Sequence, residues 1–471
     1  MRPVMSSRLP FLSRLASLAV ALCAAGCFSE SPLPECDTLA DCPVNQGYNA
    51  CIDGWCYRTQ ACADRPVVAG DGCCALTEGD RSEDTDCMLA DLALSCRDPA
   101  GPSVDDDGNI YVTCLMPLTD GTRNVVLRRL DTSGNLSVPL VAGIGTVAFS
   151  PVMGKGSTVM VQFGAGLARF STVNLGDAGG QSTGPAAARV ASNGGSDAFR
   201  GIGGWPTLDG KVVLIDEEKN ILLSYGLPRP DLGAGGAWPP TVSWTGKRMY
   251  VTWKTGVLDV VESGSNPLGT LISMNLPAVP SGAAIDVDGR IYVPLSDGTL
   301  RRYQETTSVR LQEVWSTVIF GGVGQQAVNL LVDDEGLIIA VSGTGDVQVV
   351  KDMEGFGSVV ATGSFGTPLA PLHPVLGDSG RVVASSASGR IVSVLVDSVS
   401  GLVIQGLGFN VPSPPASDML LLEDVLMYVS ETGSLMSWSY PAGPAGRWSR
   451  SGANQGSTGR TARPALLSVK P

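Results

Sequence analysis

The sequence predicts an all-β protein: a β-propeller, with eight four-stranded blades as the expected number, preceded by a small disulfide-rich region. The composition contains 59 glycines and 31 prolines in 471 residues, which is typical of a chain with many tight turns. A short motif, in which a turn residue precedes a run of branched aliphatic or aromatic residues, recurs eight times with a mean spacing of about 45 residues. That spacing lies in the range of propeller blades, and a hydrophobic content of 44% is enough for a large core.

The eight motif copies start at similar turns and continue as strands. They lie at 108–112, 157–161, 210–214, 246–251, 289–293, 336–339, 380–383 and 424–429. A second glycine turn follows several copies at a short offset, as at Gly256, Gly298, Gly389 and Gly433. Two strands joined by such a turn form a hairpin, and a hairpin sheet buries both faces only when it stacks against its neighbours.

Residues 1–26 have the three-part plan of a secretory signal peptide. Arg2, Arg8 and Arg14 precede an apolar stretch that ends in small residues, and no acidic residue interrupts it. The apolar stretch is shorter than the roughly 20 residues that span a bilayer. We therefore expect residues 1–26 to be removed and no transmembrane helix to follow.

The end of this segment resembles a bacterial lipobox. It reads Ala24-Ala25-Gly26-Cys27, with alanine where the motif usually has a larger aliphatic residue. The resemblance implies lipid attachment at Cys27 and, because no aspartate follows directly, placement at the outer membrane. Cysteine parity agrees: without Cys23 and Cys27, ten of the 12 cysteines remain and can pair completely. Cleavage at the small residues without a lipid is the alternative.

A short tether, residues 27–35, leads to a cysteine-rich region at 36–95, and the propeller is predicted to occupy 96–471. The polar, glycine-containing gaps between the cysteines cannot bury a core, so disulfides must supply the stability. The disulfide candidates are Cys36, Cys42, Cys51, Cys56, Cys62, Cys73, Cys74, Cys87, Cys96 and Cys114. The first four resemble small disulfide modules of secreted bacterial proteins, with Cys36–Cys51 and Cys42–Cys56 preferred among three connectivities; a zinc site is the alternative.

Acidic residues precede several of the repeat glycines, as at Asp105, Asp107, Asp286 and Asp288. A calcium loop of the EF type would need a glutamate at its twelfth position, and none is present. An aspartate before glycine caps a turn by accepting hydrogen bonds from backbone amides. We interpret these carboxylates as turn caps.

The repeats resemble those of the quinoprotein-like, eight-bladed β-propellers, over residues 97–471. The segment 448–459, "WSRSGANQGSTG", is similar to a Trp-to-Thr-Gly segment of that family. The resemblance implies the fold, and in the enzymes of the family it implies a quinone and calcium on the propeller axis. The tryptophan platform and the vicinal disulfide of those enzymes have no counterpart in the repeats here. We expect the tryptophans to fill interfaces between blades.

Few residues suggest catalysis. His373, the one histidine, lies in a loop before Pro374, and a structural role is expected because a multi-histidine metal site or a haem pair needs more than one imidazole. Two arginine pairs, Arg128-Arg129 and Arg301-Arg302, occupy equivalent places in two repeats and are expected on solvated strand edges, with an acidic partner as the alternative.

The net charge of −13 argues against a nucleic-acid partner. The sequence favours a monomeric, lipid-anchored, non-catalytic propeller that binds a protein or a small ligand through a loop face, with no cofactor. The alternatives are a quinone- or calcium-dependent dehydrogenase-like enzyme and a carbohydrate-binding surface protein. We also expect ring closure by the C-terminal segment, through the strand at Trp448 or the residues near Leu466, in the sheet that begins after Cys96.

Overall fold

The computed structural model describes residues 50–52 and 55–57 and, with interruptions, residues 87–450. The interruptions are residues 106, 132–133, 155–157, 164–165, 173–194, 198–201, 217–220, 226–228, 243–247, 263–271, 287, 308–309, 323–327, 334–335, 378–379, 398–401, 407, 423–424 and 441–444. The chain divides into two compact units, Met1–Gln60 and Ala61–Pro471.

The first unit contributes one described hairpin, formed by β1 (Ala50–Ile52) and β2 (Trp55–Tyr57). Its register makes Cys51 the Cα partner of Cys56. The lipid-attachment candidate Cys27 and the candidates Cys36, Cys42, Cys62, Cys73 and Cys74 lie outside the described residues, as do the signal peptide and the tether.

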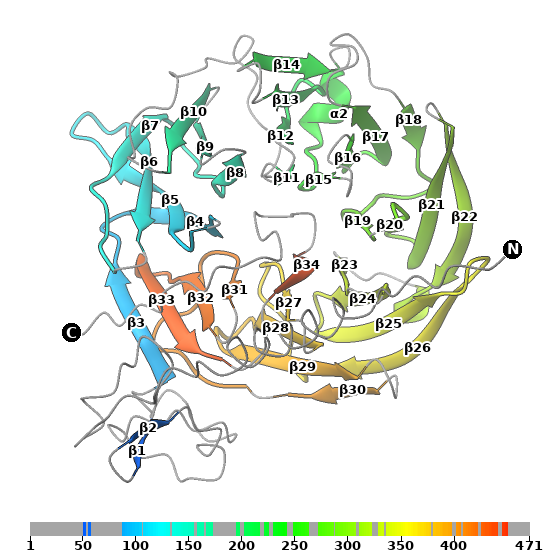
Figure 1. Ribbon diagram of the computed structural model, residues 1–471. Helices are drawn as coiled ribbons and strands as arrows, with labels where there is room; N and C mark the ends of the chain where they lie inside the picture. Colours follow the sequence, from blue (N-terminus) through cyan, green and yellow to red (C-terminus); the bar gives the residue numbers. More distant parts are fainter. Residues whose placement is uncertain are drawn as a thin grey trace, which may run out of the picture. The chain divides into compact units, whose positions relative to one another are not determined.

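The second unit consists of antiparallel sheets that follow one another around a common centre (Figure 1). Blades 1 to 4 are β4–β7 (Arg97–Val104, Ile110–Pro117, Arg123–Leu130, Leu140–Ile144), β8–β10 (Val152–Gly154, Thr158–Phe163, Gly166–Ser171), β11–β14 (Gly195–Asp197, Ile202–Pro206, Val212–Asp216, Ile221–Tyr225) and β15–β18 (Thr241–Val242, Arg248–Trp253, Val257–Glu262, Ile272–Asn275).

Blades 5 to 8 complete the ring. They are β19–β22 (Ala284–Ile285, Ile291–Pro294, Thr299–Thr307, Arg310–Val318), β23–β26 (Val328–Val332, Leu337–Ser342, Asp346–Asp352, Gly357–Ser364), β27–β30 (Val375–Gly377, Arg381–Ser385, Ile391–Asp397, Leu402–Gln405) and β31–β33 (Leu420–Leu422, Val425–Val429, Ser434–Ser439) with β3 (Met88–Ala93). The described residues thus form eight blades, of which blade 2 has three described strands. The predicted β-propeller is confirmed.

The described part also contains three elements outside this pattern. They are the short helix α2 (Pro230–Ala234), the 3₁₀ turn η5 (Phe320–Gly322) and the C-terminal strand β34 (Ala445–Arg450). Within the described residues, no helix is long and apolar enough to cross a membrane.

Seven of the eight sequence repeats form the second strand of a blade, and the repeat at 210–214 is an exception. In blade 3 it forms β13, which is the third strand, while the second strand is β12 at Ile202–Pro206. The motif at 210–214 therefore follows the second turn of its blade. It corresponds to a third strand, whereas the other seven copies correspond to second strands. Its irregular spacing from the neighbouring copies, at 157–161 and 246–251, was the signal of this shift.

The turns between strands adopt the backbone conformation that their glycines allow. Gly289, in the turn before β20, has φ of 79°, and Gly298, in the turn before β21, has φ of 78°. Residues with a Cβ rarely adopt such angles, so the glycine at each turn is a conformational requirement.

The core lies between the blades and not within any one of them. One cluster joins residues of blades 4, 5 and 6, including Leu258, Ile291 and Ile338, which are fully buried. Another joins blade 8 to blade 1 through residues such as Val126 and Val429. Each sheet contributes one face to each neighbour, which is the packing expected of a radial stack.

Most of the described tryptophans lie at these interfaces, as predicted. Trp253, Trp315 and Trp438 are buried in clusters that join neighbouring blades, and Trp205 is also buried. Trp238 is partly buried, donates a hydrogen bond from Nε1 to the carbonyl of Pro280 at 2.7 Å, and carries the Lys254 ammonium 4.7 Å from its ring centroid.

The ring is closed by an N-terminal strand, so the predicted closure by the strand at Trp448 is wrong; the alternative near Leu466 lies outside the described residues. Strand β3 pairs with β33, so that Leu92 lies opposite Leu435, and it completes the sheet of blade 8. Because β3 precedes Cys96, the chain already forms part of a blade before residue 96, where the propeller was predicted to begin. The sheet that follows Cys96, β4–β7, forms blade 1 from its own strands.

A disulfide lies at this closure. Cys96, between β3 and β4, is bonded to Cys114 on β5, so the segment that leaves blade 8 is covalently attached to blade 1. Cys87, directly before β3, is also disulfide-bonded. Two bonded cysteines therefore flank the closing strand.

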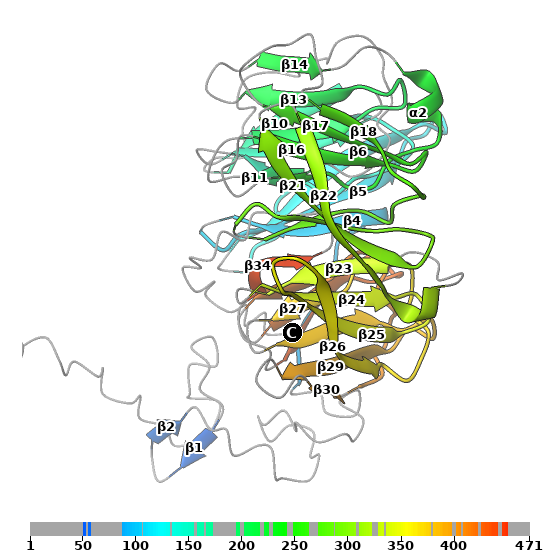
Figure 2. The same cartoon turned by 90° about the vertical axis from the view of Figure 1, so that its right-hand side faces the viewer.

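Strand β34 has a different position from the one predicted. It lies between β23 and β27, the innermost strands of blades 6 and 7, and joins these two blades into one nine-stranded sheet (Figures 1 and 2). Trp448 is the Cα partner of Val332 on β23, and Arg450 is the Cα partner of Val375 on β27.

Candidate functional site

The aspartates before the repeat glycines cap turns, as interpreted from the sequence. The Asp286 Oδ1 atom accepts hydrogen bonds from the backbone amides of Asp288 and Arg290, at 3.0 and 2.9 Å. Asp105 makes the same two contacts in blade 1, with the amides of Asp107 and Asn109. In both turns one carboxylate oxygen is occupied by the backbone of its own turn.

The second oxygen of each of these carboxylates holds a tyrosine of the following strand. Tyr111 donates its phenol proton to Asp105 Oδ2 at 2.8 Å, and Tyr292 contacts Asp286 Oδ2 at 2.9 Å. Aspartate and tyrosine are six residues apart in both blades, and this spacing is a signal in the sequence that the turn-cap interpretation did not use.

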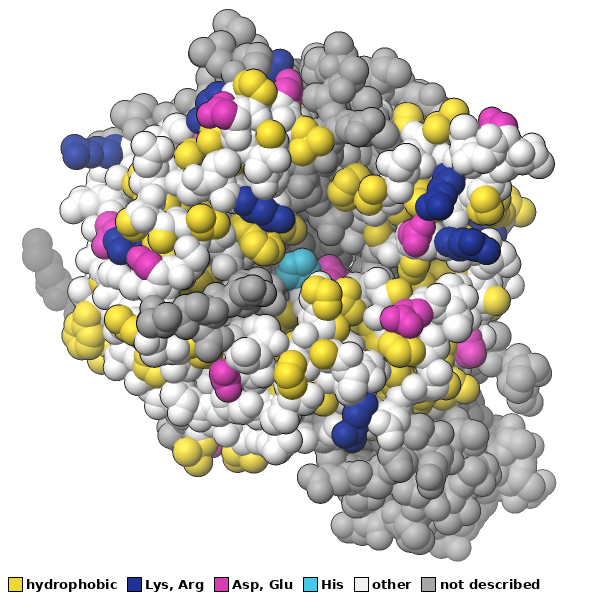
Figure 3. All heavy atoms as spheres, turned by 180° about the vertical axis from the view of Figure 1, so that it is seen from behind, with side chains coloured by type: hydrophobic (Ala, Val, Ile, Leu, Met, Phe, Trp, Pro, Cys, Tyr) yellow, Lys and Arg dark blue, Asp and Glu magenta, His cyan; other side chains and the backbone are white. Residues whose placement is uncertain are grey.

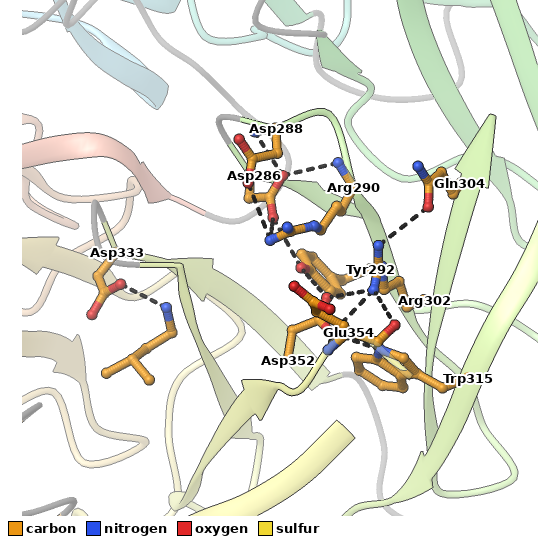
Figure 4. A network of polar contacts seen from close by, with 11 residues as sticks. Asp286, Asp288, Arg290, Tyr292, Arg302, Gln304, Trp315, Asp333, Asp352 and Glu354 are labelled. Carbon is orange, nitrogen blue, oxygen red and sulfur yellow. Dashed lines mark hydrogen bonds and ion pairs between the residues drawn. The ribbon is translucent and has the colours of Figure 1, made fainter. Parts of the chain in front are cut away.

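In blade 5 the tyrosine is the centre of a larger buried network (Figure 4). The Tyr292 hydroxyl also lies 3.0 Å from Oδ2 of Asp352, a residue at the end of β25 in blade 6. Asp352 in turn accepts hydrogen bonds from Arg302 Nη1 at 3.1 Å and from Trp315 Nε1 at 3.0 Å, both on its Oδ1 atom. Three strands of blade 5 therefore meet one carboxylate of blade 6.

Arg302 makes the remaining contacts of this network. Arg302 and Asp352 form an ion pair at 3.0 Å, and their side chains are only 6% and 4% exposed. Arg302 Nη1 also donates to the carbonyl of Glu354 at 2.9 Å, and Nη2 donates to Gln304. A buried ion pair with this many hydrogen bonds fixes the two blades at one separation.

The arginine pairs of the sequence thus have different roles from those expected. Arg302 is buried and connects two blades, so its predicted place on a solvated strand edge is wrong. Arg129, at the equivalent position of blade 1, donates to the carbonyl of Thr172 beyond β10 of blade 2 at 2.6 Å. Arg301 pairs with Glu313 at 2.7 Å, and its side chain is 19% exposed, on a strand that lies between β20 and β22 and not at the sheet edge.

Burial and the neighbouring carboxylates of Asp286 and Asp352 raise the pKa of Tyr292 far above its usual range. A phenol has one proton, so Tyr292 donates to one of its two carboxylates at a time. Burial also raises the pKa of Tyr250 and of Tyr303, each to about 12.

A second phenol also connects two blades. The hydroxyl of Tyr250, on β16 of blade 4, lies 2.6 Å from the carboxylate of Glu305 on β21 of blade 5.

These pKa shifts predict that the protein loses stability in alkali. The folded state holds the phenol protons more tightly than the unfolded state, in which tyrosine has a pKa of about 10. The contribution of these tyrosines to the free energy of unfolding is complete below pH 10 and is lost as the pH rises from about 10 to 12. For each tyrosine, the free energy of unfolding then falls by at most about 1.4 kcal/mol per pH unit. Urea unfolding at pH 8, 9, 10 and 11 measures this dependence.

Tyr292→Phe supplies the comparison, because it removes one of the titrating groups. The variant is less stable at pH 8, since the network loses the phenol, but its stability should fall less steeply above pH 10 than that of the unsubstituted protein. Equal slopes, or a stability that stays flat up to pH 11, would contradict the assignment.

His373 is held in a two-point contact with an aspartate of a neighbouring loop. Its backbone amide donates to Asp418 Oδ1 at 3.0 Å, and its Nδ1 atom lies 3.0 Å from Asp418 Oδ2. The histidine precedes β27 and the aspartate precedes β31, so the pair joins the loops that enter blades 7 and 8. In Figure 3 the histidine, the one cyan side chain, lies near the middle of the face, with an acidic side chain beside it.

The adjacent serine does not complete a nucleophilic triad with this pair. The Ser417 hydroxyl donates to the carbonyl of Asp418 at 3.0 Å and accepts the amide proton of Val429 at 2.9 Å. Its oxygen is thus engaged with the backbone. The contacts of His373 agree with the structural role expected from the sequence.

The comparisons with known proteins bear on the fold. No family model matches the chain, and no curated protein does. Among solved structures, the C-terminal WD40 domain of Sif2 aligns with 75% of this chain and 98% of its own, at a TM-score of 0.53 and 9% identity. The chain has the β-propeller fold. A chain of the mitotic checkpoint complex aligns with 74% of this chain and 93% of its own, at a TM-score of 0.46 and 12% identity.

At such identities the likeness extends to the fold and not to the function. The β-propeller part of the expected resemblance is confirmed. Its quinoprotein-like type, the lipid anchor and the cysteine-rich module remain predictions. The most distinctive residues of the site, Asp352 and Asp418, had no signal in the sequence, because each meets its partner across a blade boundary.

Proposed function

We propose that this protein is a lipid-anchored, non-catalytic β-propeller that binds a protein partner through a loop face at the bacterial outer membrane. Two features support the proposal: a buried ion pair and hydrogen bonds that join blades 5 and 6, and one set of loops that are bridged to the second strands of their blades.

The observation that carries the proposal is that the loops entering several blades are hydrogen-bonded to the strands of those blades. The loop entering a blade forms an isolated β-bridge with the end of that blade's second strand, and this recurs around the ring. The bridges are Ala237 with Trp253, Pro280 with Leu295, Leu369 with Ser386, and Pro415 with Ser430. Loops held in this way present a surface with little conformational freedom, which lowers the entropy cost of binding.

The buried network of blade 5 supports a scaffold over an enzyme. Asp286, Tyr292, Arg302 and Asp352 are residue types that catalyse reactions elsewhere, but here each contacts the others or the backbone across a blade boundary. An anchored binding protein needs such a rigid ring, and a stable lipid anchor at Cys27 would keep it at a membrane surface.

Intact-mass and cofactor analysis of the detergent-extracted protein tests this function. We expect a chain that starts at Cys27 with acyl mass added, ten cysteines in five disulfides, and no quinone or calcium. Cys27→Ser should move the protein from the membrane fraction to the soluble fraction, and Cys23→Ser, within the removed segment, should leave it at the membrane.

Two results would oppose the proposal in different ways. A stoichiometric quinone or calcium would make the dehydrogenase-like enzyme the better function. An unacylated chain with the same membrane distribution as Cys27→Ser would remove the anchor and leave the binding role to be tested separately.

A further inference from the structure

Strand β34 lies on strand edges that face the centre of the ring. In each blade the innermost strand has one neighbour within its own sheet and an edge directed to the axis. On β23 and β27 that edge is paired with β34, which runs antiparallel to both. These two edges therefore accept an extended peptide segment, and the chain's own C-terminal strand shows how one binds.

The pairing of β34 is sparse. It matches Trp448 to Val332 on one side and Ala445 and Arg450 to Gly377 and Val375 on the other, with a shift of register between the two. By contrast, β23 and β24 pair continuously over all five residues of Val328–Val332. A strand with so few ladder positions is held less firmly than the sheet that receives it.

The charge of this segment is opposite to that of the rest of the protein. Residues 441–471 contain five basic residues, Arg447, Arg450, Arg460, Arg463 and Lys470, and no acidic residue. Setting aside these five and the three arginines of residues 1–26 leaves 24 basic and 45 acidic residues in 27–440. A basic strand thus occupies a site on a strongly acidic body.

Acidic residues lie beside the site at both edges. Asp333 directly follows Val332, the partner of Trp448. On the other edge, Arg450 pairs with Val375, two residues after His373, whose imidazole contacts Asp418. The end of the basic strand therefore pairs with a residue two positions along the chain from His373.

We propose that the inner edges of β23 and β27 are the binding site for an extended, arginine-containing segment of a protein partner, and that β34 is the chain's own occupant of this site. Partner binding adds a strand by β-augmentation, with main-chain hydrogen bonds for affinity and charge for selectivity. The inference rests on the proposed role of binding a protein partner; it adds a contact at these inner strand edges to the one at the loop face, and it names the partner's chemistry.

Because β34 occupies the site, it also inhibits the binding of a partner there. Residues 440–444 connect β33 to β34, and so short a connection holds a strand at an effective concentration on the order of millimolar. A partner must compete with this concentration, so release of β34 is the step that opens the site.

The test uses the full-length chain and a labelled peptide of residues 443–452, Gly-Pro-Ala-Gly-Arg-Trp-Ser-Arg-Ser-Gly, followed by fluorescence anisotropy. The double substitution Arg447→Glu with Arg450→Glu should release β34, and the released protein should bind the peptide at least about tenfold more tightly than the unsubstituted protein does. The matched control, Arg460→Glu with Arg463→Glu, makes the same change of charge outside the strand and should bind like the unsubstituted protein.

A charge-reversed peptide and an acceptor variant test the recognition. The peptide with glutamates at 447 and 450 should not bind the released protein, and Asp418→Asn in that protein should weaken binding of the native peptide several-fold. If the released protein binds no more tightly than the control, or accepts both peptides equally, the inference is wrong.

Hydrogen exchange of the unsubstituted protein gives an answer that depends on no variant. The amides of Ala445–Arg450 are expected to exchange at least about tenfold faster than those of β24, because a displaceable strand opens without global unfolding. Equal protection would make β34 a permanent member of the sheet and would overturn the proposal. The acylation result at Cys27 is independent of both measurements, so failure here is distinguishable from failure of the proposed function.

Discussion

Deletion of Met88–Ala93 is expected to open the ring and to lower the melting temperature by about 10 °C or more. These residues form β3, which pairs with β33 along Ser434–Trp438 and completes blade 8. Ala90 in this strand and Leu94 directly after it are buried, so the deletion also exposes the core between blades 8 and 1. A loss of several kcal/mol corresponds to a shift of this size in a large domain. Thermal unfolding followed by circular dichroism measures it.

The control is deletion of residues 441–471, which removes β34. Because β34 pairs with β23 and β27 and does not close the ring, the shortened protein should melt within about 3 °C of the full chain. If this second deletion is the more damaging one, the C-terminal strand and not β3 holds the ring together, and the closure described above is wrong.

Asp352→Ala is expected to cost about 3–5 kcal/mol in the free energy of unfolding. The substitution leaves the Arg302 guanidinium buried without its carboxylate, and removal of one partner of a buried ion pair costs this much. It also leaves Trp315 Nε1 and the Tyr292 hydroxyl with one acceptor fewer. Urea unfolding at pH 7, monitored by tryptophan fluorescence, gives the value.

Two further variants separate the cost of an unpaired charge from a general loss of packing. Arg301→Met breaks the ion pairs of a 19% exposed arginine with Glu313 and Asp297, whose side chains are 39% and 37% exposed, and should cost about 1 kcal/mol, less than Asp352→Ala. Arg302→Met combined with Asp352→Ala removes both buried charges and should recover part of the loss seen with Asp352→Ala alone. Equal costs for Asp352→Ala and Arg301→Met would show that the buried pair has no special role.

The repeats were visible in the sequence because their causes are local. A turn that needs a positive φ at Gly289 or Gly298, followed by aliphatic and aromatic residues that alternate across a sheet, depends on a few neighbouring residues. The same locality explains the error in blade 3. The motif at 210–214 resembles the start of a second strand and of a third strand equally well, and only the sheet order identifies it as β13.

The site was predictable in part for the same reason. The turn-capping role of Asp105 and Asp286 follows from residues within four positions along the chain. The contact of Tyr292 with Asp352 crosses 60 positions and a blade boundary, and no pattern near either residue announces it. Arg302 was expected at a solvated strand edge, whereas its surroundings are set by blade 6.

Local sequence thus specified the hairpins, their number and the class of fold, since short-range backbone and side-chain preferences determine each of them. The closing strand, the position of β34 and the burial of Arg302 depended on how the blades meet. Strand β3 is separated from β33 by most of the chain, and many strands of similar composition could have taken its place. Packing of the complete ring selects one pairing among these, because only that arrangement buries every interface at once.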